Sequence, residues 1–138
     1  MRIRKLSILG ALAAVLLLAP LGVAKKAIGP GLDAGASLSG KYHLAGGGYL
    51  VFAVDDTGRA EGYYFRNQRF GQIFGQVEDG RLAGYWVESQ NDQVKCESKN
   101  RGSNAWGRVE MDFLNPGEFA GAIGACGLEP NDLISGRK

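Results

Sequence analysis

The sequence predicts an all-β fold, namely a small antiparallel up-and-down β-barrel, or a strongly curled meander, of about seven or eight strands. The main observation is a five-residue pattern, apolar-x-Gly-x-apolar, that occurs six times. Because alternate residues of a strand share one face, each copy places a glycine between two apolar side chains. Such a glycine lets a strand bend and lets a neighbouring backbone approach closely. The copies occupy residues 38–42, 60–64, 73–77, 82–86, 105–109 and 119–123.

Two further observations favour the same fold class. Short runs of alternating apolar and polar residues are separated by tight-turn sequences, which is typical of an antiparallel meander. After the first 24 residues, no segment has the periodicity of an amphipathic helix. We therefore expect a chain of consecutive β-hairpins.

The first 24 residues have the features of a secretory signal peptide. Arg2, Arg4 and Lys5 form a basic start, an apolar stretch follows, and small residues precede a cleavage site after Ala24. The alternative is an uncleaved membrane anchor, because the apolar run approaches spanning length. We expect cleavage, and therefore a periplasmic or secreted protein with no membrane span after it.

Cleavage leaves 114 of the 138 residues, which suits one domain with one core. It removes three of the 16 basic residues and none of the 14 acidic ones, so the net charge changes from +2 to −1. No basic patch remains that would indicate nucleic-acid binding.

The chain has two cysteines, Cys96 and Cys126. An even count in an exported chain favours a disulfide between them. The alternative is two buried thiols. We expect no metal site, because His43 is the only histidine and the cysteines are far apart in the sequence.

The first expected elements follow from Gly content and alternation. Residues 25–37 are rich in Gly and Ala and lack a period, so we expect a flexible leader before a single barrel domain at 38–138. The first copy of the glycine pattern begins a strand at 38–44. We expect the next strand at 49–54, with Leu50, Phe52 and Val54 on one face.

Turn chemistry separates the later strands. The sequence from Asp55 to Gly58 is a turn, Asp79 and Gly80 are a strong two-residue hairpin signal, and Asn115 to Gly117 is a further turn. Residues 89–104 are polar and predict a long loop. The remaining expected strands are 60–66, 71–78, 81–88, 105–114, 118–125 and a short closing strand at 134–137.

In a meander, alternate connections lie at the same end. The three tight turns then share one end, and the longer connections, including residues 89–104 and the segment after Cys126, share the other. Both cysteines belong to the second end, which supports their pairing. An end with long loops on a small barrel is the usual mouth of a ligand site.

Strand register predicts which side chains point inward near that mouth. We take these as candidate ligand-binding residues: Tyr42, Tyr64, Arg66, Trp86 and Glu88. The alternative is that the aromatic rings only fill the barrel beside the glycines, and that Arg66 and Glu88 form a weak ion pair at the rim.

Aromatic residues also occur at outward positions, where a monomeric barrel should be polar. Clustered exposed aromatics favour a partner surface, such as a homo-oligomer interface. The alternative is that the leader or the C-terminal tail covers them. The candidate interface residues are Tyr49, Tyr63, Phe65, Phe74, Tyr85 and Trp106.

Three segments resemble the avidin and streptavidin family and, more broadly, Gly-rich exported bacterial β-barrels. Residues 37–42 are similar to the first strand of that family, which has a tryptophan at the position of Tyr42. Residues 58–64 resemble its third strand, which carries Gly-x-Tyr, and residues 107–121 are similar to its penultimate strand pair. The resemblance implies a closed antiparallel barrel with a ligand site at one end.

The resemblance also argues against high-affinity biotin binding. In the family, an Asn and a Ser after the first strand bind the ureido ring of biotin. Here residues 44–48 are Leu, Ala and three glycines, so neither polar group is present. Only the tyrosine of the third strand carries over, to Tyr64. A site that has lost the partners of buried polar ligand groups rejects that ligand.

Signals of an enzyme are weak. Glu110 and Asp112 share a strand face, but the register turns them outward, where a solvated charged face is the simpler interpretation. We therefore expect no catalytic residue and no cofactor. The predicted function is non-catalytic binding of a small molecule or extended polymer, of avidin or lipocalin type, at the loop-rich end. The alternatives are an oligomeric envelope protein or inhibitor acting through the outer face, and an enzyme without a recognisable motif.

Overall fold

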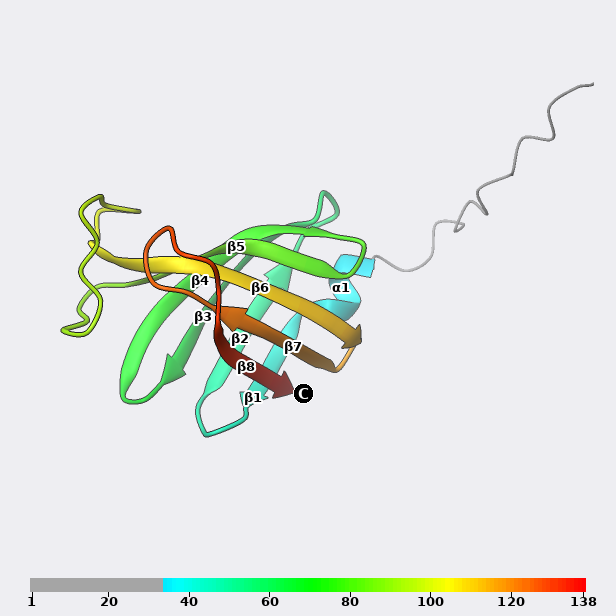
Figure 1. The fold of residues 1–138 in the computed structure, drawn as a ribbon. Coiled ribbons are helices and arrows are strands. Elements are labelled where there is room, and N and C mark those ends of the chain that lie inside the picture. The colour runs from blue at the N-terminus through cyan, green and yellow to red at the C-terminus, as the bar shows by residue number, and fades with distance from the viewer. Residues whose placement is uncertain (1–33) are drawn as a thin grey trace, which may run out of the picture.

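The computed structural model describes residues 34–138, and in this part of the chain eight antiparallel strands form a closed barrel. Each strand pairs with its neighbours in sequence, so the predicted all-β up-and-down fold is confirmed (Figure 1). The strands are β1 (Gly40–Leu44), β2 (Tyr49–Val54), β3 (Arg59–Arg66), β4 (Arg69–Glu78), β5 (Arg81–Glu88), β6 (Ala105–Asn115), β7 (Glu118–Ile123) and β8 (Asp132–Arg137).

Pairing between the first and last strands closes the barrel. His43 lies opposite Arg137 and Leu44 lies opposite Gly136, the only two register pairs between β1 and β8. By contrast, β3 and β4 share a register that runs from Arg59 to Arg66. The structure thus decides in favour of the closed barrel over an open meander.

A helical turn precedes the barrel, which corrects two expectations about residues 34–38. This segment is helix α1 (Ala34–Leu38), so residues 34–37 are not part of a flexible leader and Leu38 does not begin the first strand. Leu38 is buried in the core, and Gly35 approaches the backbone of Val54 and Asp55 too closely to accept a side chain. The remainder of the expected leader and the expected signal peptide, residues 1–33, lie outside the described residues.

The two ends of the barrel differ as expected. The β2–β3, β4–β5 and β6–β7 connections are tight and share one end, where α1 contacts β2. Asp79 and Gly80 have positive φ angles of 50° and 76°, which fits a two-residue hairpin. The loop at residues 89–104 and the connection at 124–131 lie together at the opposite end (Figure 1).

Glycines allow the sheet to curve tightly. Gly75 and Gly84 lie opposite each other on β4 and β5, and a Cβ atom added at Gly84 would overlap the carbonyl oxygen of Phe74. No larger residue fits at this position without moving a backbone, so the recurring glycine pattern has a direct steric cause.

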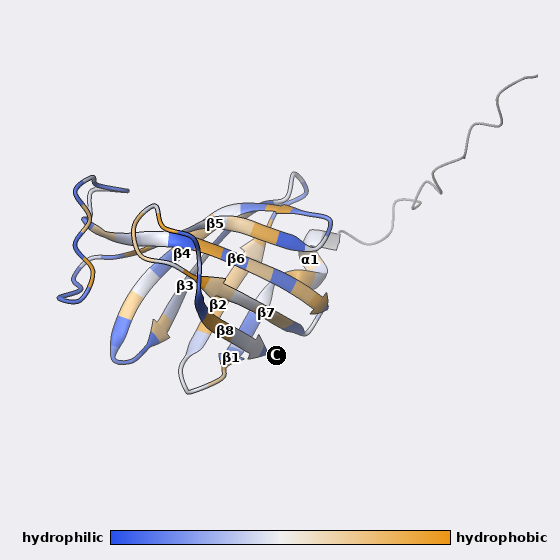
Figure 2. Ribbon diagram, in the orientation of Figure 1, coloured by the Kyte–Doolittle hydropathy of each residue, from blue (hydrophilic) through white to orange (hydrophobic). Residues whose placement is uncertain are grey.

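The core consists of Leu38 of α1 and alternate residues of β1 to β7, and Ile134 of β8 packs against it, because these strand side chains point into the barrel. Apolar and polar residues accordingly occur along the same strands in Figure 2. Among residues 34–138, no helix is long and apolar enough to span a membrane. The fully buried larger side chains are Tyr42, Leu50, Phe52, Leu82, Val109, Met111 and Phe119.

Candidate ligand-binding site

A cavity of about 210 Å³ opens at the loop-rich end of the barrel. Its inner part is apolar, because the inward side chains of several strands meet there, namely Leu50, Ile73, Trp86, Met111, Phe119, Ile123 and Ile134. Its mouth is polar and includes Arg66, Asn67, Arg69, Asn91, Gln93 and Asp132. Tyr64 and Glu88 also line the cavity, and both come from strand ends near the mouth.

Tyr64 and Glu88 form the polar centre of the site. Tyr64 on β3 lies opposite Gly71 on β4, and Gly71 lies opposite Glu88 on β5. Because Gly71 has no side chain, the Tyr64 ring extends across it, and the Tyr64 hydroxyl donates a hydrogen bond of 2.8 Å to Glu88 Oε1. A Cβ atom added at Gly71 would overlap the Tyr64 ring. Glycine at position 71 therefore permits this hydrogen bond.

The Glu88 carboxylate is buried but has no cationic partner within the described residues. Its exposed fraction is 6%. Its second oxygen, Oε2, accepts a hydrogen bond of 2.7 Å from Asn91 Nδ2. None of the ion pairs in residues 34–138 involves Glu88. Burial, followed by the neighbouring Glu88 charge, raises the pKa of Tyr64 well above that of a free tyrosine, so Tyr64 remains a donor.

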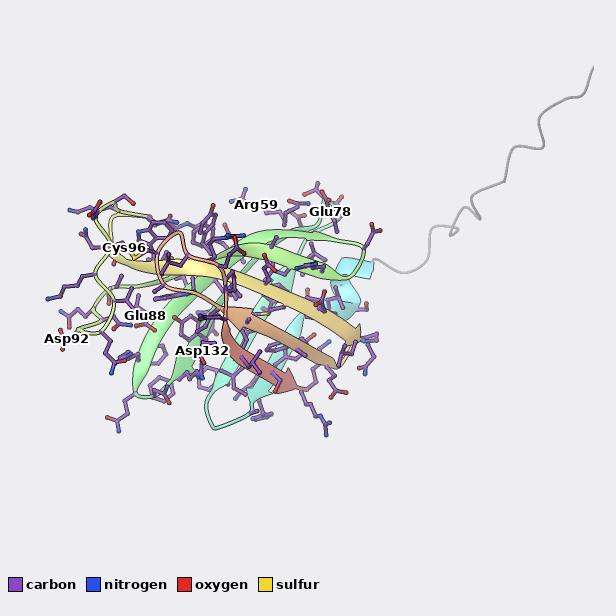
Figure 3. All side chains as sticks on the ribbon, viewed as in Figure 1. Arg59, Glu78, Glu88, Asp92, Cys96 and Asp132 are labelled. Atoms are coloured by element: carbon purple, nitrogen blue, oxygen red, sulfur yellow. A yellow bond between two sulfur atoms is a disulfide. The ribbon has the colours of Figure 1, made fainter. Side chains whose placement is uncertain are left out.

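The alternative of an ion pair between Arg66 and Glu88 is wrong. The carboxylate nearest to the Arg66 guanidinium belongs to Asp132 on β8, with 3.9 Å between nitrogen and oxygen. Figure 3 shows Glu88 and Asp132 toward the end of the molecule where Asp92 and Cys96 lie, away from Glu78. Strand register placed Arg66 and Glu88 at the same end, but it could not show which partners they choose.

Four of the five candidate ligand-binding residues line the cavity, and Tyr42 does not. The Tyr42 side chain points toward the opposite end, where its hydroxyl proton is donated to the carbonyl oxygen of Leu38 (2.6 Å) and is shared with that of Pro116 at the longer distance of 3.2 Å. Tyr42 is fully buried, and burial raises its pKa. Register sets the face of a strand residue but not the direction in which its side chain leans along the barrel axis. Tyr42 is therefore a core residue.

Several residues at the mouth were not predicted from the sequence. Arg69 faces inward at the start of β4, which begins two residues earlier than expected. Counting back in steps of two from the inward residue Ile73 would have found it. Asn91 belongs to the long loop, and its Oδ1 accepts hydrogen bonds from the backbone N–H groups of Gln93 and Val94. An Asn soon after a strand is a weak signal of such a turn.

The expected disulfide is present and joins the two long connections at the mouth. Cys96 and Cys126 are bonded, with 5.5 Å between their Cα atoms. Close to this bond, Trp86 Nε1 donates a hydrogen bond of 2.9 Å to the carbonyl oxygen of Gly124. The walls of the mouth are therefore held together covalently and by a buried hydrogen bond. A disulfide is consistent with an oxidising, exported compartment.

The loop at residues 89–104 folds against part of the outer aromatic face. The Arg101 guanidinium lies 3.6 Å from the centre of the Phe74 ring, and Trp106 Nε1 donates to the Ser98 carbonyl oxygen at 2.8 Å. These two contacts come from the loop and not from the C-terminal tail. Of the other candidate interface residues, Tyr49 and Phe65 pack together on the outer surface, with ring centres 6.0 Å apart.

Part of the outer face stays open. Tyr63 and Tyr85 are 51% and 41% exposed, and Phe70, which was not among the candidates, is 61% exposed. Glu110 lies on this outer surface and forms ion pairs with Arg81 and Arg108. The outer face thus combines a charged network with a few exposed rings.

The site can hold an apolar group in its inner part and polar groups at its mouth. Within residues 34–138, no cluster of three or more His, Cys, Asp and Glu side chains is placed to bind a metal ion. Comparisons with protein families, with curated proteins and with solved structures found no match to this chain.

Proposed function

We propose that this chain is an exported, non-catalytic binding protein that holds a small ligand in the cavity at the loop-rich end of the barrel. The observation that carries the proposal is the cavity itself, which combines an apolar inner part with the Tyr64–Glu88 hydrogen bond at its mouth. Ligand sites typically have this composition, with few polar groups among apolar ones. Helix α1 contacts β2 at the opposite end, which favours a small molecule over a polymer that threads the barrel.

The disulfide supports both parts of the proposal. It holds the mouth loops in place before a ligand arrives, and such preorganisation lowers the entropic cost of binding. It also fits export, for which the basic and apolar start of the sequence is the second argument. If export includes cleavage, mass spectrometry of the exported chain will find Lys25 as its first residue. A chain that retains residues 1–24 would contradict that part of the proposal.

A fluorescent apolar probe tests the binding function. We expect anilinonaphthalene sulfonate to bind the oxidised protein with one site, and the variant Ile123→Trp to abolish binding, because Ile123 lines the cavity and tryptophan is larger. Leu133→Trp is the matched control, since Leu133 is 80% exposed on β8. Unchanged binding by Ile123→Trp would contradict the assignment of the ligand to this cavity.

The exposed outer rings support a second candidate function, protein–protein interaction. Tyr63, Phe70 and Tyr85 could form the centre of an interface between copies of this chain or with another envelope protein. Native mass spectrometry of the wild type and of the double variant Tyr63→Ser/Tyr85→Ser tests it. An oligomer that dissociates in the variant supports this function, and a monomeric wild type removes the homo-oligomer.

A further inference from the structure

The cavity holds a buried negative charge whose only described partners are neutral. Tyr64 and Asn91 each donate one hydrogen bond to the Glu88 carboxylate, and each carboxylate oxygen can accept two. Burying a carboxylate without a cation is costly, because neutral donors replace only part of its hydration. The Glu88 carboxylate can therefore accept further hydrogen bonds, and a cationic group of a ligand is the partner that its negative charge favours.

Two positive charges line the same cavity one row nearer to its mouth. Arg66 and Arg69 lie opposite each other on β3 and β4, and each is two residues from the row that holds Tyr64 and Gly71. Two residues of a strand span roughly 7 Å. Arg66 is only loosely paired with Asp132, at 3.9 Å, and Arg69 Nη1 donates a long hydrogen bond of 3.4 Å to Gln93. Among the ion pairs of residues 34–138, none joins either arginine to Glu88.

We propose that the ligand is a zwitterion of the hydrophobic amino acid type. Its ammonium group binds Glu88, its carboxylate binds Arg66 and Arg69, and its apolar side chain enters the inner part of the cavity beside Ile73 and Trp86. This inference rests on the proposed binding function and names the ligand class for that site.

The separation of the charges favours a zwitterion over a ligand with one charge. A carboxylic acid would satisfy the arginines but leave Glu88 without a cation, and an amine would satisfy Glu88 but leave the arginines without an anion. An α-amino acid carries both groups on the same carbon atom, and with a hydrogen bond at each group it can reach two adjacent rows of the barrel. The indole N–H group of Trp86 already donates a hydrogen bond to the Gly124 carbonyl oxygen, so Trp86 can contact the ligand only through its apolar ring.

A matched series of three ligands tests the inference on the unmodified, oxidised protein. The ligands are phenylalanine, phenethylamine and phenylpropionate, which share one apolar body and carry both charges, only the ammonium and only the carboxylate. Isothermal titration calorimetry at neutral pH gives each affinity. We expect phenylalanine to bind at least about ten-fold more tightly than either relative, because each lost charged hydrogen bond weakens binding by about that factor or more.

Equal affinity for the three ligands, or tightest binding of a singly charged ligand, would overturn the inference. Neither result removes the binding function, which the apolar probe and the Ile123→Trp variant test separately. If none of the three ligands binds while the apolar probe does, the ligand class is wrong and the cavity function stands. If the probe fails as well, the proposed function fails.

Variants then assign each charge. Glu88→Gln should weaken phenylalanine and phenethylamine binding about ten-fold or more and leave phenylpropionate binding unchanged or tighter. Arg69→Gln should weaken phenylalanine and phenylpropionate but not phenethylamine. Glu78→Gln is the control, because Glu78 is exposed at the far end of β4 (Figure 3). Unchanged phenylalanine binding by Glu88→Gln would contradict the assignment.

Discussion

The hydroxyl group of Tyr64 donates a 2.8 Å hydrogen bond to Glu88 across a strand that separates them, and it can do so because the residue between them is Gly71. Three adjacent strands thus contribute Tyr64, Gly71 and Glu88 to one row of residues across the barrel wall. Tyr64 and Glu88 line the cavity, so Gly71, which is not part of the recurring five-residue glycine pattern, shapes the candidate site.

The Gly71 gap leads to a first prediction. Gly71→Ala should destabilise the fold by about 1–3 kcal/mol, the range for overpacking, because the added Cβ overlaps the Tyr64 ring. It should also displace that ring and weaken ligand binding. Urea unfolding and probe titration measure the two effects. Tyr64→Phe is the control, since it removes the hydrogen bond without filling the gap. If Gly71→Ala is as stable as the wild type, the Tyr64 ring can move away from position 71 without cost, which would contradict this prediction.

The raised pKa of Tyr64 predicts sensitivity to alkali. A tyrosine whose pKa is higher in the folded state than in the unfolded chain favours folding fully below the unfolded pKa of about 10, and this contribution is lost as the pH rises above it. Stability should therefore fall above about pH 10, and Tyr64→Phe should make that fall less steep. Urea unfolding at several alkaline pH values measures the slope. Equal slopes in wild type and variant would contradict the assignment.

Tyr42 separates stability from binding. Tyr42→Phe should cost about 1–3 kcal/mol, because it removes a buried donor from the carbonyl oxygens of Leu38 and Pro116. It should leave ligand affinity unchanged, since Tyr42 does not line the cavity. Denaturant unfolding and calorimetry check both parts. A large loss of affinity with intact stability would return Tyr42 to the candidate site.

The disulfide should contribute about 3–4 kcal/mol to stability, the value of the chain-entropy model for a loop of 30 residues. The double variant Cys96→Ser/Cys126→Ser should lose that amount and should also bind the ligand more weakly, because the two mouth loops are then no longer joined. Urea unfolding of the variant, compared with wild type with and without reductant, measures the first effect. The double variant has no cysteine left, so a reductant should not change its stability. If a reductant does destabilise it, the effect of reductant on the wild type has a cause other than the disulfide.

The order and face of the strands could be read from the sequence because they depend on local features. Turn residues such as Asp79 and Gly80 mark where the chain reverses, and alternation marks the inward face. The same reasoning placed Tyr64, Arg66, Trp86 and Glu88 near one mouth, and all four line the cavity. It failed where a boundary shifted, since β4 begins at Arg69 rather than at residue 71 and Arg69 was missed.

By itself, the sequence determined that this chain is a small antiparallel sheet, a barrel or a strongly curled meander, with a loop-rich mouth and two cysteines at that mouth. It could do so because strand periodicity, turn chemistry and the position of the cysteines are properties of neighbouring residues. Only the tertiary structure decided that the barrel closes, that Tyr42 leans away from the cavity and that Glu88 bonds to Tyr64 and Asn91 rather than to Arg66. These outcomes depend on where side chains from distant strands and loops meet in space. Periodicity specifies a face, whereas the choice of partner is a competition among all groups that the closed barrel brings within reach.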